Sequence, residues 1–205
     1  MAKLVQSPIL DESFALIDHE FGNHAFKPDE YAVVRRVIHS TADFEFKQLI
    51  AFSPGAIGAG LRALAQGSPI IVDVSMVRQG IVGMVQRTFN NPILTAVDNG
   101  DPAKAGRTRT ETGLLHCLAQ APEAVVVIGN APTALIALSD EIQAQKAHPA
   151  LVIGAPVGFV AVEAAKQRLA QTPVPQIRVV GRKGGSSVAA AMVNALLVLA
   201  WEREP

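Results

Sequence analysis

Short apolar runs alternate along the chain with longer stretches whose apolar residues recur every three or four positions. This alternation is typical of a parallel β-sheet with helices on both of its faces. Several runs are continuously apolar, as strands buried on both faces usually are, so these strands are expected in the middle of the sheet. The pattern therefore predicts an α/β fold with a doubly wound, mostly parallel sheet of about six strands. The expected strands are 49–53, 69–74, 92–98, 124–130, 149–154 and 176–181.

Two leading helices are expected before the first strand, around 11–21 and 29–41. Asp11 could cap the first helix, and Pro28 followed by two acidic residues begins the second. Later helices are expected behind three further breaks in the pattern, at Pro54, Pro132 and Gly184-Gly185. No Pro-rich linker or charge run divides the chain, so residues 1–205 are expected to form a single domain.

The charge balance argues against several kinds of partner. Lys and Arg together number 18, as do Asp and Glu, so the net charge is zero and no basic face is expected for nucleic acid or an anionic membrane. The longest apolar run, 188–201, contains Asn194 and is shorter than the roughly 20 residues that span a bilayer. It is expected to be a core or interface helix. The single Cys117 cannot form an intrachain disulfide, and the N-terminus lacks the features of a signal peptide, so a cytoplasmic location is expected.

Three glycine-rich turns directly follow expected strands, at 129–133, 154–159 and 181–187. In parallel sheets, ligands bind where the carboxyl ends of strands meet the amino ends of helices. Glycine and proline let the backbone approach a ligand closely, and N–H groups that point outward would suit a carboxylate or phosphate. Any strand-to-helix turn also favours these residues, so a purely structural explanation stays open. None of the turns has the spacing of a dinucleotide fingerprint or phosphate loop, which leaves nucleotide binding weakly supported.

His39 lies near the end of the second expected helix. Arg35, Arg36 and His39 share the helix face beside an apolar stripe. Neighbouring positive charge favours the neutral imidazole, which can give or take a proton near neutral pH. Asp43 one turn later could orient the ring if the helix continues that far. The alternative is a histidine that stabilises a helix C-terminus, and the residues alone favour this alternative somewhat.

The other candidate residues have simpler explanations. His116 and Cys117 are neighbours within a helix and do not face each other, so neither a catalytic nor a metal-binding pair is expected, and Cys117 is expected in the core. The polar connection at 98–113 is most simply a solvated loop, and Ser13 an exposed helix residue. No cluster of His, Cys or acidic residues has the spacing of metal ligands, so no protein-held metal is expected. The remaining histidines are expected on the surface: His19, His24 and His148.

Four motifs in succession resemble the precorrin-8X methylmutase (precorrin isomerase) family of corrin-ring biosynthesis. They are "VIHSTAD" at 37–43, "VVVIGNAPTAL" at 125–135, "PALVIGAPVGFV" at 149–160 and "GRKGGSSVAAAMVNAL" at 181–196. The resemblance extends almost from end to end of the chain. It implies an isomerase that moves a methyl group from C11 to C12 of a ring-contracted tetrapyrrole, giving hydrogenobyrinate or its cobalt form. It also implies a homodimer whose substrate pocket lies near the subunit interface.

The resemblance assigns His39 as the catalytic residue, and Ser13 and Arg109 as substrate-binding residues. A methyl shift around a conjugated ring needs a proton placed on a pyrrole nitrogen, so no cofactor is implied, and any cobalt belongs to the substrate. The substrate carries several carboxylates, for which arginines and backbone N–H groups of the three turns are suitable anchors. The further anchors expected on this basis are Arg35, Arg182, Asn130, Thr133, Gly185 and Ser186.

Two departures from the family pattern bear on substrate binding. Val82 stands where some relatives have a hydroxyl, and Ala164-Ala165-Lys166 stands where relatives commonly have Glu-Ser-Lys. Two other functions stay open from the sequence: a corrinoid carrier that binds the product without catalysis, and a nucleotide-binding α/β enzyme. The missing nucleotide fingerprint argues against the second.

Overall fold

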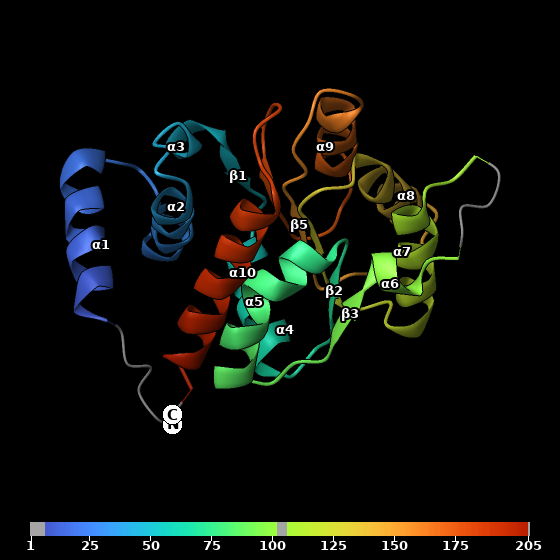
Figure 1. Ribbon diagram of the computed structural model, residues 1–205, viewed down its shortest axis with the longest axis horizontal. Helices are drawn as coiled ribbons and strands as arrows, with labels where there is room; N and C mark the ends of the chain where they lie inside the picture. Colours follow the sequence, from blue (N-terminus) through green and yellow to red (C-terminus); the bar gives the residue numbers. More distant parts are fainter. Residues whose placement is uncertain (1–6, 102–105, 205) are drawn as a thin grey trace.

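A computed structural model describes residues 7–101 and 106–204 of the chain. The strands form one six-stranded sheet, and Figure 1 shows helices on both sides of it. The strand order is β1-β6-β5-β4-β2-β3, and every neighbouring pair is parallel except β1 with β6. All six expected strands are present, and the predicted mostly parallel, doubly wound sheet is confirmed. The strands are β1 (Ile50–Phe52), β2 (Ile70–Val72), β3 (Ile93–Thr95), β4 (Val125–Ile128), β5 (Leu151–Gly154) and β6 (Gln176–Val179).

The central strands are the ones with continuous apolar runs, as predicted. Every residue of β2, β4 and β5 is buried, whereas the edge strands β1 and β3 are partly exposed. Alternate side chains of a strand point to opposite faces of the sheet. In β4, Val125 and Val127 therefore join one core, while Val126 and Ile128 join the other.

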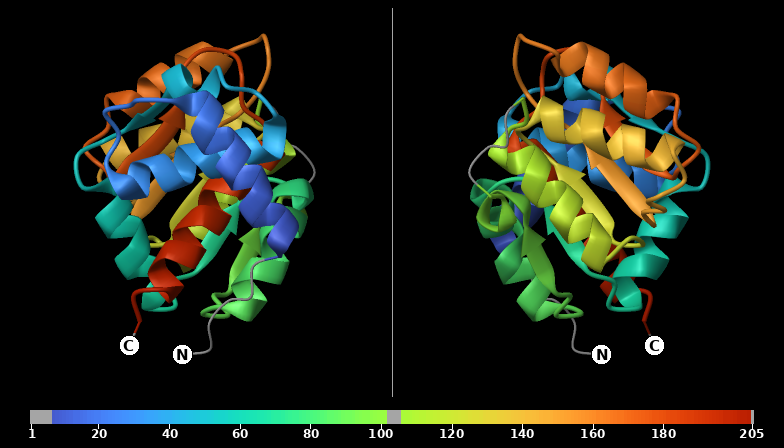
Figure 2. Two further views of the ribbon diagram at one scale, coloured as in Figure 1. Left: turned by 90° about the vertical axis from the view of Figure 1, so that its left-hand side faces the viewer. Right: turned by 90° about the vertical axis from the view of Figure 1, so that its right-hand side faces the viewer.

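The two cores are covered by different sets of helices. The first is formed with residues of α2, α4, α5 and α10, and the second with residues of α7, α8 and α9. Figure 2 shows α1 and α2 outermost on one side of the molecule and α7 and α8 on the opposite side. The longer helices are α1 (Pro8–Phe21), α2 (Pro28–Thr41), α4 (Ala56–Ala65), α5 (Ser75–Arg87), α7 (Arg109–Gln120), α8 (Pro132–Gln143), α9 (Val162–Ala170) and α10 (Ser186–Trp201), and the short ones are α3 (Phe46–Leu49) and α6 (Ala96–Asn99).

Helix α10 packs against α2, α4 and α5 and is buried over most of its length, which confirms the predicted core helix. Its Asn194 donates a hydrogen bond from Nδ2 to the Gly80 carbonyl at 2.9 Å, so the polar residue in the apolar run joins α10 to α5. Within 7–101 and 106–204, no helix has the length and apolar content needed to cross a membrane.

The two leading helices are also present, with one difference at the first. Helix α1 begins at Pro8, and its cap is Ser7, whose hydroxyl accepts a hydrogen bond from the Leu10 N–H at 3.3 Å. The prediction that Asp11 caps this helix is wrong, because a proline at the first helical position moves the start three residues earlier. Helix α2 begins at Pro28 as predicted.

The polar connection predicted at 98–113 is shorter than expected. Its two ends are helical, because α6 ends at Asn99 and α7 begins at Arg109 behind the capping hydroxyl of Thr108. Part of the predicted connection, 102–105, lies outside the described residues, as do residues 1–6 of the N-terminus.

Candidate functional site

The turn at 129–131 is built around a buried carboxylate. Asp73 follows β2 and is fully buried. One of its oxygens accepts hydrogen bonds from the N–H groups of Val74 (3.0 Å) and Gly129 (3.1 Å), and the other from those of Asn130 (2.6 Å) and Ala131 (2.8 Å). Burial raises the pKa of Asp73, and the four N–H donors oppose that rise.

This arrangement corrects the expectation that the N–H groups of the turn at 129–133 point outward to a ligand. Three successive N–H groups point inward instead, and their anion is the protein's own Asp73. The sequence conceals this, because Asp73 and Gly129 are 56 positions apart and become neighbours only when β2 pairs with β4. Asn130 keeps an exposed position on the turn.

The turns at 154–159 and 181–187 pack against each other. Gly185 donates its N–H to the Ala155 carbonyl at 2.8 Å, so this N–H also points into the protein and not toward a ligand. A Cβ atom at Gly184 would lie 2.3 Å from that carbonyl oxygen, which explains why glycine is needed there. The buried Lys166 of α9 donates from Nζ to the carbonyls of Gly181 (2.8 Å) and Lys183 (2.7 Å) in the second of these turns. Burial lowers the pKa of Lys166 to about 8.

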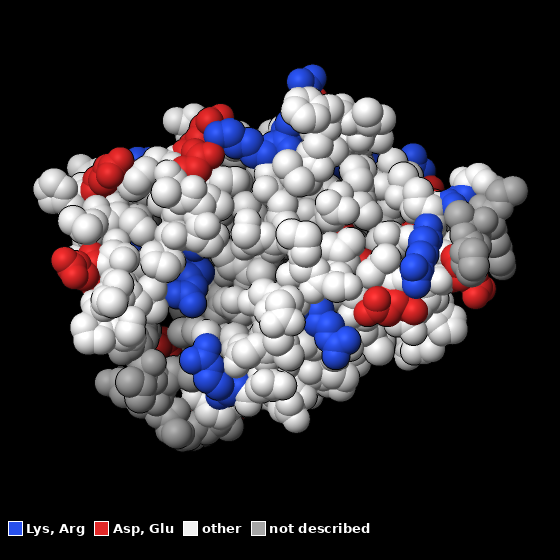
Figure 3. Space-filling model, viewed as in Figure 1, with Lys and Arg blue, Asp and Glu red and all other residues white. Residues whose placement is uncertain are grey.

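A cavity of about 330 Å³ opens between α1, α2, α5 and α10. Three arginines line it, and Figure 3 shows separate basic side chains around a mostly uncharged hollow on this face. Apolar contacts come from α1, α2, α5 and α10, and Glu202 adds an acidic side chain to the lining. The lining residues are Ser7, Leu10, Phe14, Ala32, Arg35, Arg36, Met84, Arg87, Ala195, Val198, Leu199 and Glu202.

The three arginines have different surroundings. Arg35 forms an ion pair with Asp18 at 2.9 Å and stacks on the Phe14 ring, with 4.2 Å from the guanidinium carbon to the ring centre. Arg36 has no acidic partner within 4 Å in the described part of the chain, and burial, then Arg87, then Arg35, lower its pKa. Arg87 donates from Nε to the Gly83 carbonyl at 3.0 Å. Guanidinium groups that converge without matching carboxylates are suited to bind an anion.

His39 lies in the last turn of α2, at the rim of this cavity. The residue as a whole is exposed, but its imidazole is partly covered by Phe14, which it contacts edge to face with ring centres 5.5 Å apart. Phe14 and Arg36 line the cavity itself. Burial, and to a smaller extent Arg36, lower the pKa of His39. Both effects favour the neutral form of the imidazole over the charged form, as the neighbouring arginines suggested.

Asp43 was expected to orient this ring only if the helix continued that far, and the helix does not reach Asp43. Helix α2 ends at Thr41, and Ala42 then turns the chain into the left-handed region with φ of 52°. This turn carries the Asp43 carboxylate to Lys183 and to the N–H of Glu45. The i,i+4 geometry needed to reach His39 is lost where the helix ends.

Comparison with known proteins identifies the family. The profile of the precorrin-8X methylmutase family matches residues 8–199. The cobalt-precorrin-8 methylmutase of Synechocystis sp. is 56% identical over 211 residues, covering 96% of this chain and 97% of the relative. The precorrin-8X methylmutase of Pseudomonas aeruginosa is 41% identical and covers 96% and 95%. The crystal structure of precorrin-8X methylmutase from Thermus thermophilus matches with a TM-score of 0.87 and 44% identity, over 96% of this chain and 98% of that chain.

The chain belongs to the precorrin-8X methylmutase family. It is thus a methyl-shifting isomerase of cobalamin biosynthesis, as its motifs implied.

The candidate binding residues of this methylmutase fall into three groups. Ser13 precedes Phe14 on α1, and the Phe14 ring contacts both His39 and Arg35. The Ser13 hydroxyl donates to the Ile9 carbonyl at 2.7 Å. The exposed Arg109 begins α7, where Thr108 and Thr133 share a hydrogen bond of 2.9 Å between their hydroxyls.

The third group lies where α10 begins. It contains Gly185, Ser186 and Arg182, and the exposed Arg182 pairs with Glu163 at 3.2 Å. Figure 1 shows α1 and α7 at opposite ends of the long axis, so one chain does not bring Ser13 and Arg109 together.

The sequence placed Arg36 on the helix face of His39, but Arg36 was not among the expected substrate anchors. Three further residues of this methylmutase were missed, Arg87, Asp73 and Lys183, because each reaches its partner through packing between distant segments.

Proposed function

We propose that this isomerase moves the methyl group from C11 to C12 of precorrin-8X or cobalt-precorrin-8, with His39 as the group that transfers a proton to a pyrrole nitrogen. The observation that supports the proposal is the position of the His39 imidazole, which contacts Phe14 at the rim of an arginine-lined cavity. A protonated pyrrole nitrogen lets the conjugated ring accept the electron density that the migrating methyl displaces. The protonated form of His39 donates this proton, and the neutral imidazole that remains takes a proton back after the shift, so the step needs no cofactor.

Arg36 and Arg87 are proposed to bind carboxylate side chains of the tetrapyrrole. Both line the cavity, and the positive charge of Arg87 lowers the pKa of Arg36. An anion bound between the two guanidinium groups would relieve this repulsion. Arg35 is proposed to contribute less, because Asp18 already neutralises it. A cavity of about 330 Å³ is at the small end of the range of about 300–1,000 Å³ for ligand pockets, so it accommodates only part of a macrocycle.

A homodimer is proposed to complete the pocket. The separation of Ser13 and His39 from Arg109 and Thr133 within one chain supports this, because a second subunit can supply the distant group. Mixing a His39→Ala variant with an Arg109→Met variant tests it. Recovery of activity in the mixture of two inactive proteins is expected, and no recovery after exchange of subunits would contradict a shared site.

The proposed reaction is tested by the change from the yellow precursor to the orange-red corrin in absorbance, with both metal-free and cobalt-containing substrate. We expect His39→Ala to lower kcat by about 10²–10⁴-fold, the usual contribution of a positioned acid–base group. An unchanged rate would refute the role of His39. A protein that binds the product tightly but never converts the precursor would instead be a corrinoid carrier. Location in the cytoplasm stays a prediction, tested by cell fractionation.

A further inference from the structure

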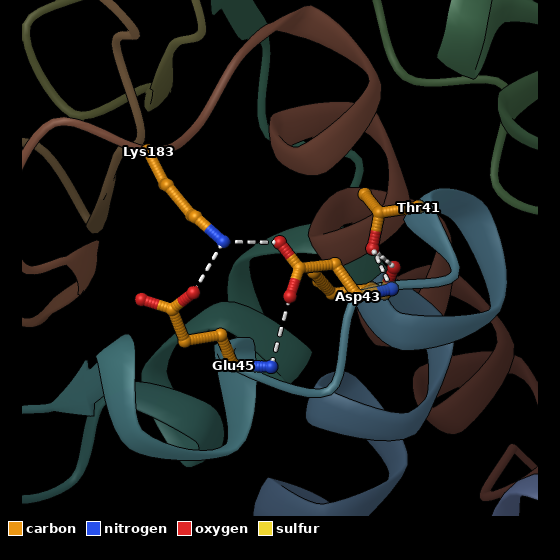
Figure 4. Close-up of polar contacts among 5 residues, drawn as sticks. Thr41, Asp43, Glu45 and Lys183 are labelled. Atoms are coloured by element: carbon orange, nitrogen blue, oxygen red, sulfur yellow. Dashed lines mark hydrogen bonds and ion pairs between the residues drawn. The ribbon is translucent and has the colours of Figure 1, made fainter.

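Lys183 joins two parts of the molecule that are far apart in sequence. Its Nζ donates to Asp43 at 2.6 Å and to Glu45 at 2.5 Å (Figure 4). Lys183 lies in the turn before α10, whereas both carboxylates lie just beyond the end of α2. The contact therefore links the glycine-rich turn to the end of the helix that carries His39.

The end of α2 is closed by a short chain of hydrogen bonds. The Thr41 hydroxyl donates to the Val37 carbonyl at 2.9 Å and accepts from the Asp43 N–H at 3.3 Å. Asp43 in turn accepts from the Glu45 N–H at 2.9 Å with the carboxylate oxygen that Lys183 does not use (Figure 4). The last carbonyls of a helix lack partners within the helix, so its last turn depends on such contacts to stay ordered. His39 is in that turn.

The backbone of Lys183 is itself held in place. Its carbonyl accepts a hydrogen bond from the buried Lys166 at 2.7 Å, and two residues later Gly185 is bonded to Ala155. A long lysine side chain usually loses much conformational freedom on forming an ion pair. Here the backbone of Lys183 is fixed by its contacts with the core, and its Nζ is held by two carboxylates. Both ends of the side chain therefore have defined positions.

We propose that Lys183 is a positioning residue for the methyl shift: it fixes the last turn of α2, and through it the orientation of His39 toward the cavity. This inference rests on the function proposed for His39. The hydrogen bonds from Lys183 lower the pKa of Asp43 and raise the pKa of Lys183, so the ion pair is intact throughout the neutral range.

The role in catalysis can be separated from a role in stability. Exposed ion pairs contribute little to folding, and Lys183 and Glu45 are 42% and 56% exposed. Small displacements of a catalytic group, in contrast, reduce the rate strongly, because the reaction needs a defined geometry. Loss of Lys183 should therefore change kcat much more than it changes the unfolding midpoint.

The test compares Lys183→Met, Lys183→Arg and the control Arg203→Met. Arg203 pairs with Asp29 at 2.5 Å, so the control removes an ion pair of similar exposure from the opposite end of the same helix. We expect Lys183→Met to lower kcat about tenfold with KM within twofold, Lys183→Arg to restore most of the rate, and Arg203→Met to behave like the wild type. The urea midpoints of all variants should agree closely.

The double variant Lys183→Met with Asp43→Asn distinguishes two roles of Lys183: holding Asp43 in place, and neutralising the charge of Asp43. If Lys183 acts by holding Asp43, the double variant is as slow as Lys183→Met. Recovery of the rate in the double variant would overturn the proposal in favour of charge compensation alone. If His39→Ala is inactive and Lys183→Met keeps the wild-type kcat, the positioning role of Lys183 is also overturned. If His39→Ala is fully active, the proposed function itself is overturned.

Discussion

The buried amine of Lys166 makes a specific prediction for stability at alkaline pH. Burial lowers the pKa of Lys166 from 10.5 to about 8, and the residue is only 3% exposed. Below pH 8 the amine is charged in the folded and unfolded states alike. Between pH 8 and 10.5 the unfolded chain binds a proton that the folded protein does not, so the free energy of unfolding rises with pH in this window. Above 10.5 both states are neutral and the contribution is constant.

The size of this rise follows from the pKa difference. A shift of that size corresponds to about 3 kcal/mol, and screening by nearby solvent reduces the expected value to about 2 kcal/mol. In Lys166→Met the rise is absent, because methionine occupies a similar volume and does not titrate. The difference in the free energy of unfolding, wild type minus variant, should therefore increase by about 2 kcal/mol from pH 7.5 to 10.5.

Urea unfolding followed by circular dichroism at several pH values measures this difference. Other groups that titrate in the window, such as Cys117, are present in both proteins and cancel. The loss of the hydrogen bonds to Gly181 and Lys183 shifts the variant at every pH below 8 by the same amount, so it does not imitate the slope. If the difference in the free energy of unfolding between wild type and Lys166→Met stays constant within about 0.5 kcal/mol from pH 7.5 to 10.5, the lowered pKa of a buried Lys166 is refuted.

Three further predictions follow from the geometry. Asp73→Asn should lower the free energy of unfolding by about 2–5 kcal/mol, because its amide group would face two N–H donors; a loss below about 1 kcal/mol in urea unfolding would contradict the four hydrogen bonds. Gly113→Ala should lower the free energy of unfolding by at least about 3 kcal/mol, because the new Cβ would lie 1.8 Å from the Ala96 carbonyl oxygen. Gly83→Ala has open space around the new Cβ and should stabilise α5 by about 0.5–1 kcal/mol. Equal unfolding midpoints for these two variants would be inconsistent with the packing of α7 on α6. Arg87→Met should raise KM about tenfold and change kcat less than twofold in steady-state kinetics, as expected for a carboxylate anchor, and a lower kcat at unchanged KM would exclude that role.

The local pattern of the sequence was enough to predict the elements of this fold. Continuous apolar runs marked β2, β4 and β5 as central strands, and the break at Pro28 marked the start of α2. These features depend on residues that are close in sequence, where side-chain periodicity directly reflects burial. The motifs were also enough to predict the family and its methyl-shift activity, which the comparisons support over nearly the full chain.

Only the tertiary structure decided how the site is built. No local pattern shows that β1 lies antiparallel beside β6, or that the N–H groups at 129–131 turn inward to Asp73. Nor does it show that Arg87 approaches Arg36, or that Lys183 reaches Asp43 across 140 positions. Each of these contacts joins segments that the sheet order and the packing of α10 on α2 and α5 bring together, so the physical information lies in the assembled layers and not in any one segment.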